Sequence, residues 1–261
     1  MTILTLFTKT NKKKQITQIK QKFRSYFENL DVEENILGVN AAGWLQVSIE
    51  GDDEKIATNY LANKIGLCPT YISNLEKNSP ISGRISKFHE KKVTVDIGVF
   101  KPKITLANIS IEKLQEQLIE DKKNSLKKMA SLFGLAEGLQ VNINLLNINE
   151  EKNFIEAELS DRQISFFNIW QKSFLDRLIV IGSSYNEVKK AISLARLGKD
   201  VINIESLGLF EQVLMCKLGT DAAGLIPRVG KILRTARLIV FNPKKIYLFL
   251  NKKNCPQLLS K

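Results

Sequence analysis

The sequence predicts an α+β protein built from three consecutive parts. Segments in which apolar residues alternate are interleaved with segments in which they recur at helical spacing, and the positive charge is concentrated in the last part. A length of 261 residues is enough for two or three small domains, each with its own core. We expect domains at 1–75, 79–160 and 176–261, with a linker helix at 161–175.

The first part predicts a small α+β unit in the order strand, helix, strand, strand, helix. "TILTLF" and "WLQVSIE" alternate, and apolar residues recur at helical spacing between Asn11 and Leu30. "DDEKIATNYLANKIG" begins with acidic residues and stops at Gly66, as helices tend to do. We find no combination of residues typical of a catalytic or binding site in this part of the sequence.

The central part predicts two β-hairpins separated by a helical insertion. "ISGRISKFHEKKVTVDIGVF" reads as two strands with bends at Gly83 and Gly98, and "GLQVNINLLNINEEKNFIEAELS" reads as two more. Between the hairpins, residues 109–134 have helical spacing, which we interpret as a lid or packing helix.

The last part predicts the order βαββαβ, which is the ferredoxin-like arrangement. Four segments are predicted to be strands: "DRLIVIG", "DVINIES", "FEQVLMCKL" and "ARLIVF". The βαββα order of the first part suggests that it is a diverged copy of this ferredoxin-like arrangement. Ser160 with Gln163, and Ser184 with Glu187, have the spacing of helix-capping pairs. Phe166, Phe167, Ile169 and Trp170 predict a linker helix buried between domains, with a base-stacking patch as the alternative.

Charge is the strongest compositional signal. Of the formal net charge of +12, residues 161–261 carry +10, with 17 Lys and Arg against 7 Asp and Glu. A field of one sign attracts polyanions over a Debye length of about 8 to 10 Å. The alternative interpretation is a solvated basic face followed by a Lys-rich tail.

"GLIPRVGKI", residues 224–232, resembles a phosphate-binding loop but lacks its essential parts. Five residues separate the first glycine from the Gly-Lys pair, Ile232 stands where Ser or Thr would hold magnesium, and Pro227 removes a backbone N–H. We instead expect a helix that begins near Pro227, where proline is tolerated in the first turn. Its basic flank, and the cations that follow, form a predicted phosphate-backbone site: Arg228, Lys231, Arg234, Arg237, Lys244 and Lys245.

Enzymatic chemistry has little support in the residues. His89 is the only histidine, and Cys68, Cys216 and Cys255 are isolated, so we expect no metal site, disulfide framework or catalytic triad. Asn242-Pro243 reads as a turn signal. No signal peptide or membrane span is evident, and we expect a cytoplasmic protein without a cofactor.

The two central hairpins resemble the first and last hairpins of an S1-type RNA-binding domain, a five-stranded barrel of the oligonucleotide-binding type. This resemblance implies single-stranded RNA as the ligand, although Lys91, Lys92, Val93 and Val95 replace the stacking aromatics of the second strand. The predicted contacts on the barrel are Arg84, Lys87, Phe88, His89, Lys91 and Lys92.

The motifs "DRLIVIG", "SLGLFEQVLMCKLGTDAAGLIP" and "FNPKKI", preceded by the S1-like part, resemble an archaeal family catalogued as domain of unknown function 2110. This family implies an archaeal cytoplasmic setting and no particular activity. The layout of a small α+β unit joined to an S1 barrel is also similar to the stalk subunit of archaeal and eukaryotic RNA polymerases.

Our first hypothesis is a non-catalytic RNA-binding protein of the archaeal translation or transcription apparatus. Its partners would be single-stranded or ribosomal RNA, and the ribosome or RNA polymerase. The second hypothesis is a protein-binding adaptor that docks on a ribosome or polymerase and uses its basic surface only for steering. A third, an enzyme acting on nucleotides or RNA, would need a carboxylate cluster assembled from distant residues. The oligomeric state stays open.

Overall fold

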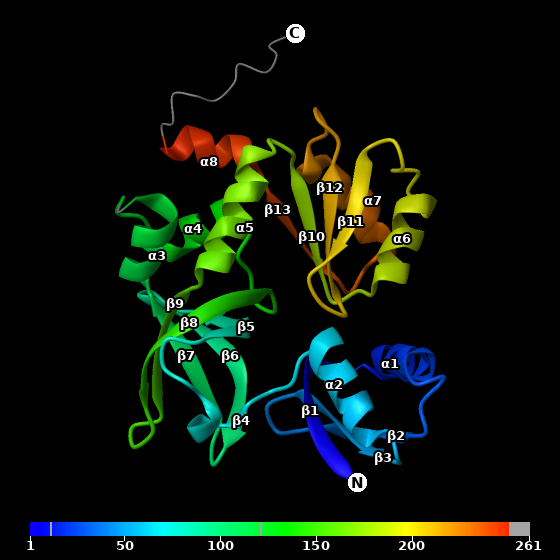
Figure 1. The fold of residues 1–261 in the computed structure, drawn as a ribbon. Coiled ribbons are helices and arrows are strands. Elements are labelled where there is room, and N and C mark those ends of the chain that lie inside the picture. Colours follow the sequence, from blue (N-terminus) through cyan, green and yellow to red (C-terminus); the bar gives the residue numbers. More distant parts are fainter. Residues whose placement is uncertain (11, 121, 251–261) are drawn as a thin grey trace. The chain divides into compact units, whose positions relative to one another are not determined.

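The computed structural model describes residues 1–10, 12–120 and 122–250, and it has the predicted α+β class (Figure 1). The chain divides into two compact units. The first comprises residues 1–76 with the segments 97–106 and 150–153, and the second comprises the remaining residues. Within the described ranges, every helix is too short or too polar to cross a membrane.

The N-terminal sheet has the predicted element order and is antiparallel, with strands ordered β1-β3-β2. Apolar residues of both helices and of the central strand are completely buried, among them Phe23, Leu61 and Val47. The free edge of β1 is covered by residues 66–68, since Cys68 N–H donates to the carbonyl of Thr5 at 2.8 Å. The elements are β1 (Thr2–Lys9), α1 (Lys13–Tyr26), β2 (Glu33–Val39), β3 (Trp44–Glu50) and α2 (Glu54–Lys64).

The central part is a closed five-stranded barrel in which β5 pairs with both β6 and β8, and β7 pairs with both β6 and β9. The sequence pattern singled out two hairpins but not β7, although its residues alternate between buried and half-buried. Helical structure begins at Ile111 rather than at residue 109 and consists of two helices. The elements are β4 (Thr70–Tyr71), a 3-10 turn η1 (Ile72–Asn74), β5 (Pro80–Phe88), β6 (Lys92–Lys101), β7 (Thr105–Ser110), α3 (Ile111–Ile119), α4 (Leu126–Phe133), β8 (Gln140–Asn149) and β9 (Phe154–Leu159).

The C-terminal domain has the predicted βαββαβ order and an antiparallel sheet ordered β11-β12-β10-β13. Counted within each part, this is the same strand order as in the N-terminal sheet, where residues 66–68 stand in the place of the fourth strand. The elements are the linker helix α5 (Asp161–Lys172), then β10 (Arg177–Ile181), α6 (Tyr185–Leu194), β11 (Val201–Ser206), β12 (Glu211–Cys216), α7 (Ala222–Ile232), β13 (Arg237–Phe241) and α8 (Pro243–Leu250).

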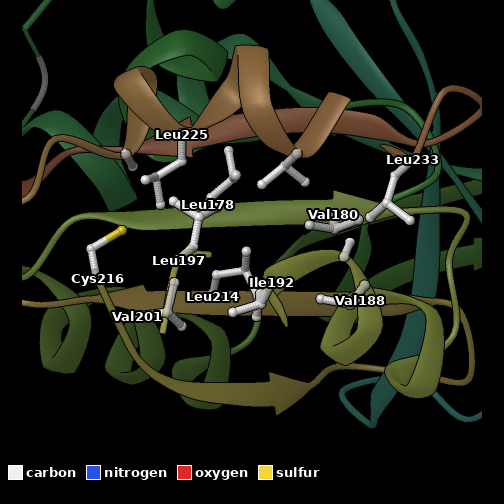
Figure 2. Close-up of a cluster of buried hydrophobic side chains, with 13 residues drawn as sticks. Leu178, Val180, Val188, Ile192, Leu197, Val201, Leu214, Cys216, Leu225 and Leu233 are labelled. Carbon is white, nitrogen blue, oxygen red and sulfur yellow. The ribbon is translucent and has the colours of Figure 1, made fainter. Parts of the chain in front are cut away.

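One face of this sheet packs against α6 and α7. Figure 2 shows Leu225 of α7, and Val188 and Ile192 of α6, in one cluster with Leu178 and Val180 of β10. The opposite face is also covered, because Phe241 lies 5.0 Å from Trp170 of α5, ring centre to ring centre. Phe167 of α5 stacks on Phe241 and contacts Phe133 of α4 edge-on. These aromatic rings join the helices beside the barrel to the C-terminal sheet.

Two expectations about the end of the chain were wrong. Helix α7 begins at Ala222, five residues before Pro227, because Asp221 accepts the Ala223 N–H at 2.9 Å and Asp176 accepts the Ala222 N–H at 3.2 Å. These two carboxylates fix the start, and Pro227 is accommodated inside the helix. Asn242-Pro243 is a helix start, not a turn: Asn242 accepts the Lys245 N–H at 2.9 Å, and proline is favoured at the first helical position.

We expect a substitution of Gly98, in β6, to lower the stability of the protein markedly. Gly98 has φ +87°, and an added Cβ would lie 2.6 Å from both Cβ and Sγ of Cys68. We expect Gly98→Ala to lower the free energy of unfolding by roughly 2 to 4 kcal/mol, through backbone strain and overpacking. Gly198→Ala is the matched control, since nothing lies within 4 Å of its added Cβ. Chemical unfolding curves of the two variants should differ, and equal stabilities would contradict the assigned constraint.

Candidate nucleic-acid interface

A groove of about 880 Å³ lies where the turn between β5 and β6 faces α4 and the start of β13. Phe88 and His89 line it from the barrel, Lys127 from α4, and Arg237 from β13. Apolar residues, including Leu126 and Leu135, form much of the remaining wall. Glu90 and Glu137 also line it, so the groove combines flat side chains, an apolar wall, two cations and two carboxylates.

Backbone hydrogen bonds hold the barrel side of the groove. His89 N–H donates to the carbonyl of Lys92 at 2.9 Å, which closes the β5–β6 turn. Ile111 N–H, at the start of α3, donates to the carbonyl of Lys91 at 2.8 Å. Lys87, Lys91 and Lys92 are all exposed around this turn. The turn is thus anchored to the insertion while its cationic side chains point to solvent.

Arg237 lies at the opposite wall and is held by one exposed partner. Its Nη1 donates to the backbone carbonyl of Glu137 at 3.0 Å, and its Nη2 lies 3.5 Å from Oε2 of the same residue. Both side chains are about half exposed, with fractions of 51% and 46%. Exposed ion pairs contribute only about 0.2 to 1 kcal/mol, so a phosphate can displace this carboxylate at little cost.

The predicted basic flank of α7 divides into two parts. Lys231 and Arg234 are exposed at the end of the helix and lead directly into Arg237. Arg228 instead donates to the carbonyls of Ala195 and Arg196, just past the end of α6. Its Nη1 also lies 3.8 Å from the carboxylate of Asp200, and about half of its side chain is exposed, so Arg228 links α6 to α7 while still facing solvent.

Arg84 does not lie on the surface. Its Nη1 and Nη2 donate to the two carboxylate oxygens of Glu211, at 2.5 and 3.0 Å, and its Nη1 also donates to the carbonyl of Gly138 at 3.2 Å. Only 7% of its side chain and 4% of that of Glu211 are exposed. A guanidinium committed in this way is not available to a phosphate, which removes Arg84 from the predicted contacts.

Lys244 and Lys245 line a second, smaller pocket of about 170 Å³, together with Lys217 and Asp176. The pocket lies beyond the end of β13 that is opposite to Arg237. Asp176 accepts hydrogen bonds from Ala222 N–H and from the side-chain amide of Asn242. Burial raises the pKa of the Asp176 carboxyl, while these hydrogen bonds and the charge of Lys244 act in the opposite direction.

The two cysteines that the structure describes are both buried and are not activated as nucleophiles. Burial, together with Asp176 and Asp221, raises the pKa of the Cys216 thiol to about 12, far from the value at which a thiolate forms readily. Cys68 is also buried, and its thiol donates to the carbonyl of Leu6 at 3.5 Å. No group of three His, Cys, Asp or Glu placed to hold a metal ion occurs in the parts of the chain that the structure describes.

Two cations of these pockets were not predicted from the sequence. Lys127 lies in the helical insertion and lines the groove, and Lys217 follows β12 and lines the smaller pocket. Each lysine lines a pocket only because residues distant in the sequence fold next to it. No local sequence pattern could have identified it as part of a site.

This fold defines a class: an α+β protein with a closed five-stranded barrel of the oligonucleotide-binding type in its central part and an antiparallel sheet with helices in its C-terminal part. The particular family follows from three family models that match along the chain. They are the DUF2110 N-terminal domain at residues 2–70, the DUF2110 central domain at residues 75–171 and the DUF2110 C-terminal domain at residues 175–241. The chain belongs to this family.

A search of the curated proteins finds no match to this sequence. Among solved structures, GSP13 from Bacillus subtilis is 18% identical, with 34% of this chain and 58% of that chain covered and a TM-score of 0.26. The complex of a/eIF2alpha, aDim2p and rRNA from Pyrococcus horikoshii is 13% identical, with 47% and 60% covered and a TM-score of 0.27. The intact alpha subunit of aIF2 from Pyrococcus abyssi is 9% identical, with 64% and 97% covered and a TM-score of 0.25. This chain therefore spans about three fifths of the first two structures.

The raised pKa of Asp176 predicts a pH dependence of stability. A carboxyl whose pKa is higher in the folded than in the unfolded state stabilises the fold below its unfolded pKa, and that contribution is lost as pH rises through the folded value. Asp176→Asn keeps an acceptor oxygen and cannot ionise. We expect the stability of the wild type, relative to this variant, to fall as pH rises from about 4 to about 7. Urea unfolding of both proteins across this range measures the difference, and a constant or increasing difference would contradict the assignment.

Proposed function

We propose that this protein binds single-stranded RNA, without catalysing a reaction, along a surface that runs from the β5–β6 turn through the groove to the end of α7. The observation that carries the proposal is the groove itself, which brings Phe88 and His89 together with Lys127 and Arg237. A role in the archaeal translation or transcription apparatus, with the ribosome or RNA polymerase as the larger partner, is the setting we propose for it.

The chemistry of the groove fits an unpaired nucleotide. A base that stacks on an aromatic or histidine side chain gains about 1 to 3 kcal/mol, and sequence-specific stacking requires bases that are not held in a duplex. Phe88 is half-buried and His89 is exposed at the groove. The apolar wall formed by Leu126, Ala130 and Leu135 would shield the rest of the base from water. These features favour a splayed base over a duplex.

Cations on both sides of the groove fit the phosphates of the same strand. We propose Lys87, Lys91 and Lys92 at the barrel turn, and Lys231, Arg234 and Arg237 at the other side, as the backbone contacts. Lys244 and Lys245, at the second pocket, extend the basic surface along the C-terminal domain. Each neutralised phosphate releases counterions, so affinity for such a surface depends strongly on salt.

The first test is a fluorescence titration of nuclease-treated protein with a mixed-sequence RNA of about twenty nucleotides across a salt series. We expect the triple variant Lys231→Ala, Arg234→Ala, Arg237→Ala to bind more weakly, with a log-log salt slope shallower by about 2, because three phosphate contacts are lost. The matched control is Lys189→Ala, Lys190→Ala, Lys199→Ala, which removes the same charge from exposed positions elsewhere in the domain.

Equal losses in the two triple variants would show that net charge alone governs binding and would refute the surface. An absence of binding by the wild type at low salt would refute RNA binding altogether. It would favour the adaptor hypothesis, which a pull-down after nuclease digestion would then test.

A substitution of Glu137 tests the same surface by an expected increase in RNA affinity. Its carboxylate is the exposed partner of Arg237, and a bound phosphate would have to displace it. We expect Glu137→Gln to raise RNA affinity about two- to five-fold, because the guanidinium is released while its backbone hydrogen bond remains. Glu116→Gln, which removes an exposed carboxylate beside Lys113 on α3, is the control and should change affinity less. The same titration measures both, and equal increases would contradict a specific role for Arg237.

A further inference from the structure

The groove has walls from two different domains, and one polar contact between those domains is almost completely buried. The barrel wall comes from the end of β5, and Arg84 lies in the same strand, four residues before Phe88. The other wall includes Arg237, the first residue of β13, which pairs in register with Ile181 of β10. Ile181 also pairs with Glu211 of β12. Arg84 therefore lies four residues from one wall of the groove, and a single strand, β10, separates Glu211 from the other wall.

We infer that the Arg84–Glu211 ion pair is the positioning element that holds the two walls of the groove in one register. The inference rests on the proposed function for its consequence in binding, but its structural part can be tested without RNA.

The geometry of the pair supports a directional role. Both guanidinium nitrogens that point to Glu211 are engaged, one with each carboxylate oxygen, and this two-point contact fixes orientation as well as distance. The third hydrogen bond, from Arg84 to the carbonyl of Gly138, reaches the residue that follows Glu137. Glu137 in turn holds Arg237. A continuous chain of contacts thus runs from the barrel strand through the buried pair to the cation at the groove.

The surroundings of the pair explain why an ion pair is needed there. The aromatic contacts between α4, α5 and β13 are apolar and tolerate sliding more readily than a hydrogen-bonded pair does. Asp96 is also buried, and it pairs with Arg84 in the β5–β6 register. An added side chain at Gly208 would collide with the Glu211 carboxylate, which shows how closely the loop before β12 encloses it.

Arg84→Lys is the most informative substitution, because it keeps a positive charge next to Glu211 but loses the planar two-point contact. Arg177→Lys is the matched control. Arg177 is also buried in the C-terminal domain, but its guanidinium bonds to Trp170, Ser173 and Leu175 at the end of α5 and not to the barrel. Both variants exchange one buried arginine, so a general loss of stability should affect them alike.

The structural readout is a distance between spin labels at Ser86→Cys in the barrel and Thr235→Cys before β13, two exposed positions outside the proposed contacts. Cys255→Ser removes the one cysteine beyond the described residues, and Cys68 and Cys216 are buried. We expect a single narrow distance distribution in the otherwise unchanged protein and in Arg177→Lys, and a broadened or shifted one in Arg84→Lys. An unchanged distribution in Arg84→Lys would overturn the inference. If that variant fails to fold, Glu211→Gln, which preserves the shape of the side chain, takes its place under the same criteria.

The binding readout is the RNA titration described above. We expect Arg84→Lys to lose about five- to ten-fold in affinity with a salt slope shallower by about 1, because fewer phosphates meet both walls at once. Arg177→Lys should retain the slope. A broadened distance distribution with unchanged affinity and slope would overturn the link between the pair and binding. A wild type that binds no RNA would refute the proposed function, while the distance measurement would still decide whether the pair positions the walls.

Discussion

The constraint on which the candidate site depends is the buried contact between Arg84 of the barrel and Glu211 of the C-terminal sheet. Taking two charges out of water is costly, and only good geometry with further hydrogen bonds offsets that cost. Here both carboxylate oxygens accept from the guanidinium, and the carbonyl of Gly138 accepts a further bond. The aromatic rings of Phe133, Phe167 and Phe241 supply apolar burial around the same junction. Burial thus holds the two domains together, and the ion pair selects one orientation of the barrel strand against the sheet.

This junction also limits where a ligand can bind. All but the last residue of β10 are buried, because helices α6 and α7 cover one face of the sheet and α5 with Phe241 covers the other. Neither face of this sheet is free along β10 to serve as a binding platform. In the proposed function, RNA would therefore contact this domain at the ends of its strands and helices. That is where the groove and the smaller lysine-lined pocket are found.

Much of the fold could be predicted from the sequence, because it depends on local patterns. Short apolar segments such as "DRLIVIG" marked the strands of the C-terminal sheet, and the Ser184–Glu187 capping box is present as its spacing predicted. The start of α7 was misplaced, because Asp176, 46 residues earlier, accepts its first N–H. The site was less predictable for the same reason. Arg84 has the local appearance of a surface cation on a strand, yet its partner lies 127 residues further along the chain. Lys127 becomes part of the groove only because α4 packs beside the barrel turn.

The positive electrostatic field at the surface of the C-terminal part is weaker than its net charge alone would indicate. Arg177 is buried, and its guanidinium donates to Trp170, Ser173 and Leu175, while burial lowers its pKa. Arg228 serves the carbonyls at the end of α6. The cations that remain at the surface are mainly lysines and the arginines at the end of α7, and in the proposed function these would contact phosphates without reading bases. Base contacts at the groove would come from Phe88 and His89, the flat side chains among its lining residues. A surface with many backbone contacts and few stacking positions favours affinity over sequence discrimination. In the proposed function, selectivity would therefore arise from the shape of the strand that can pass between the two walls, and we infer that the buried ion pair controls this shape.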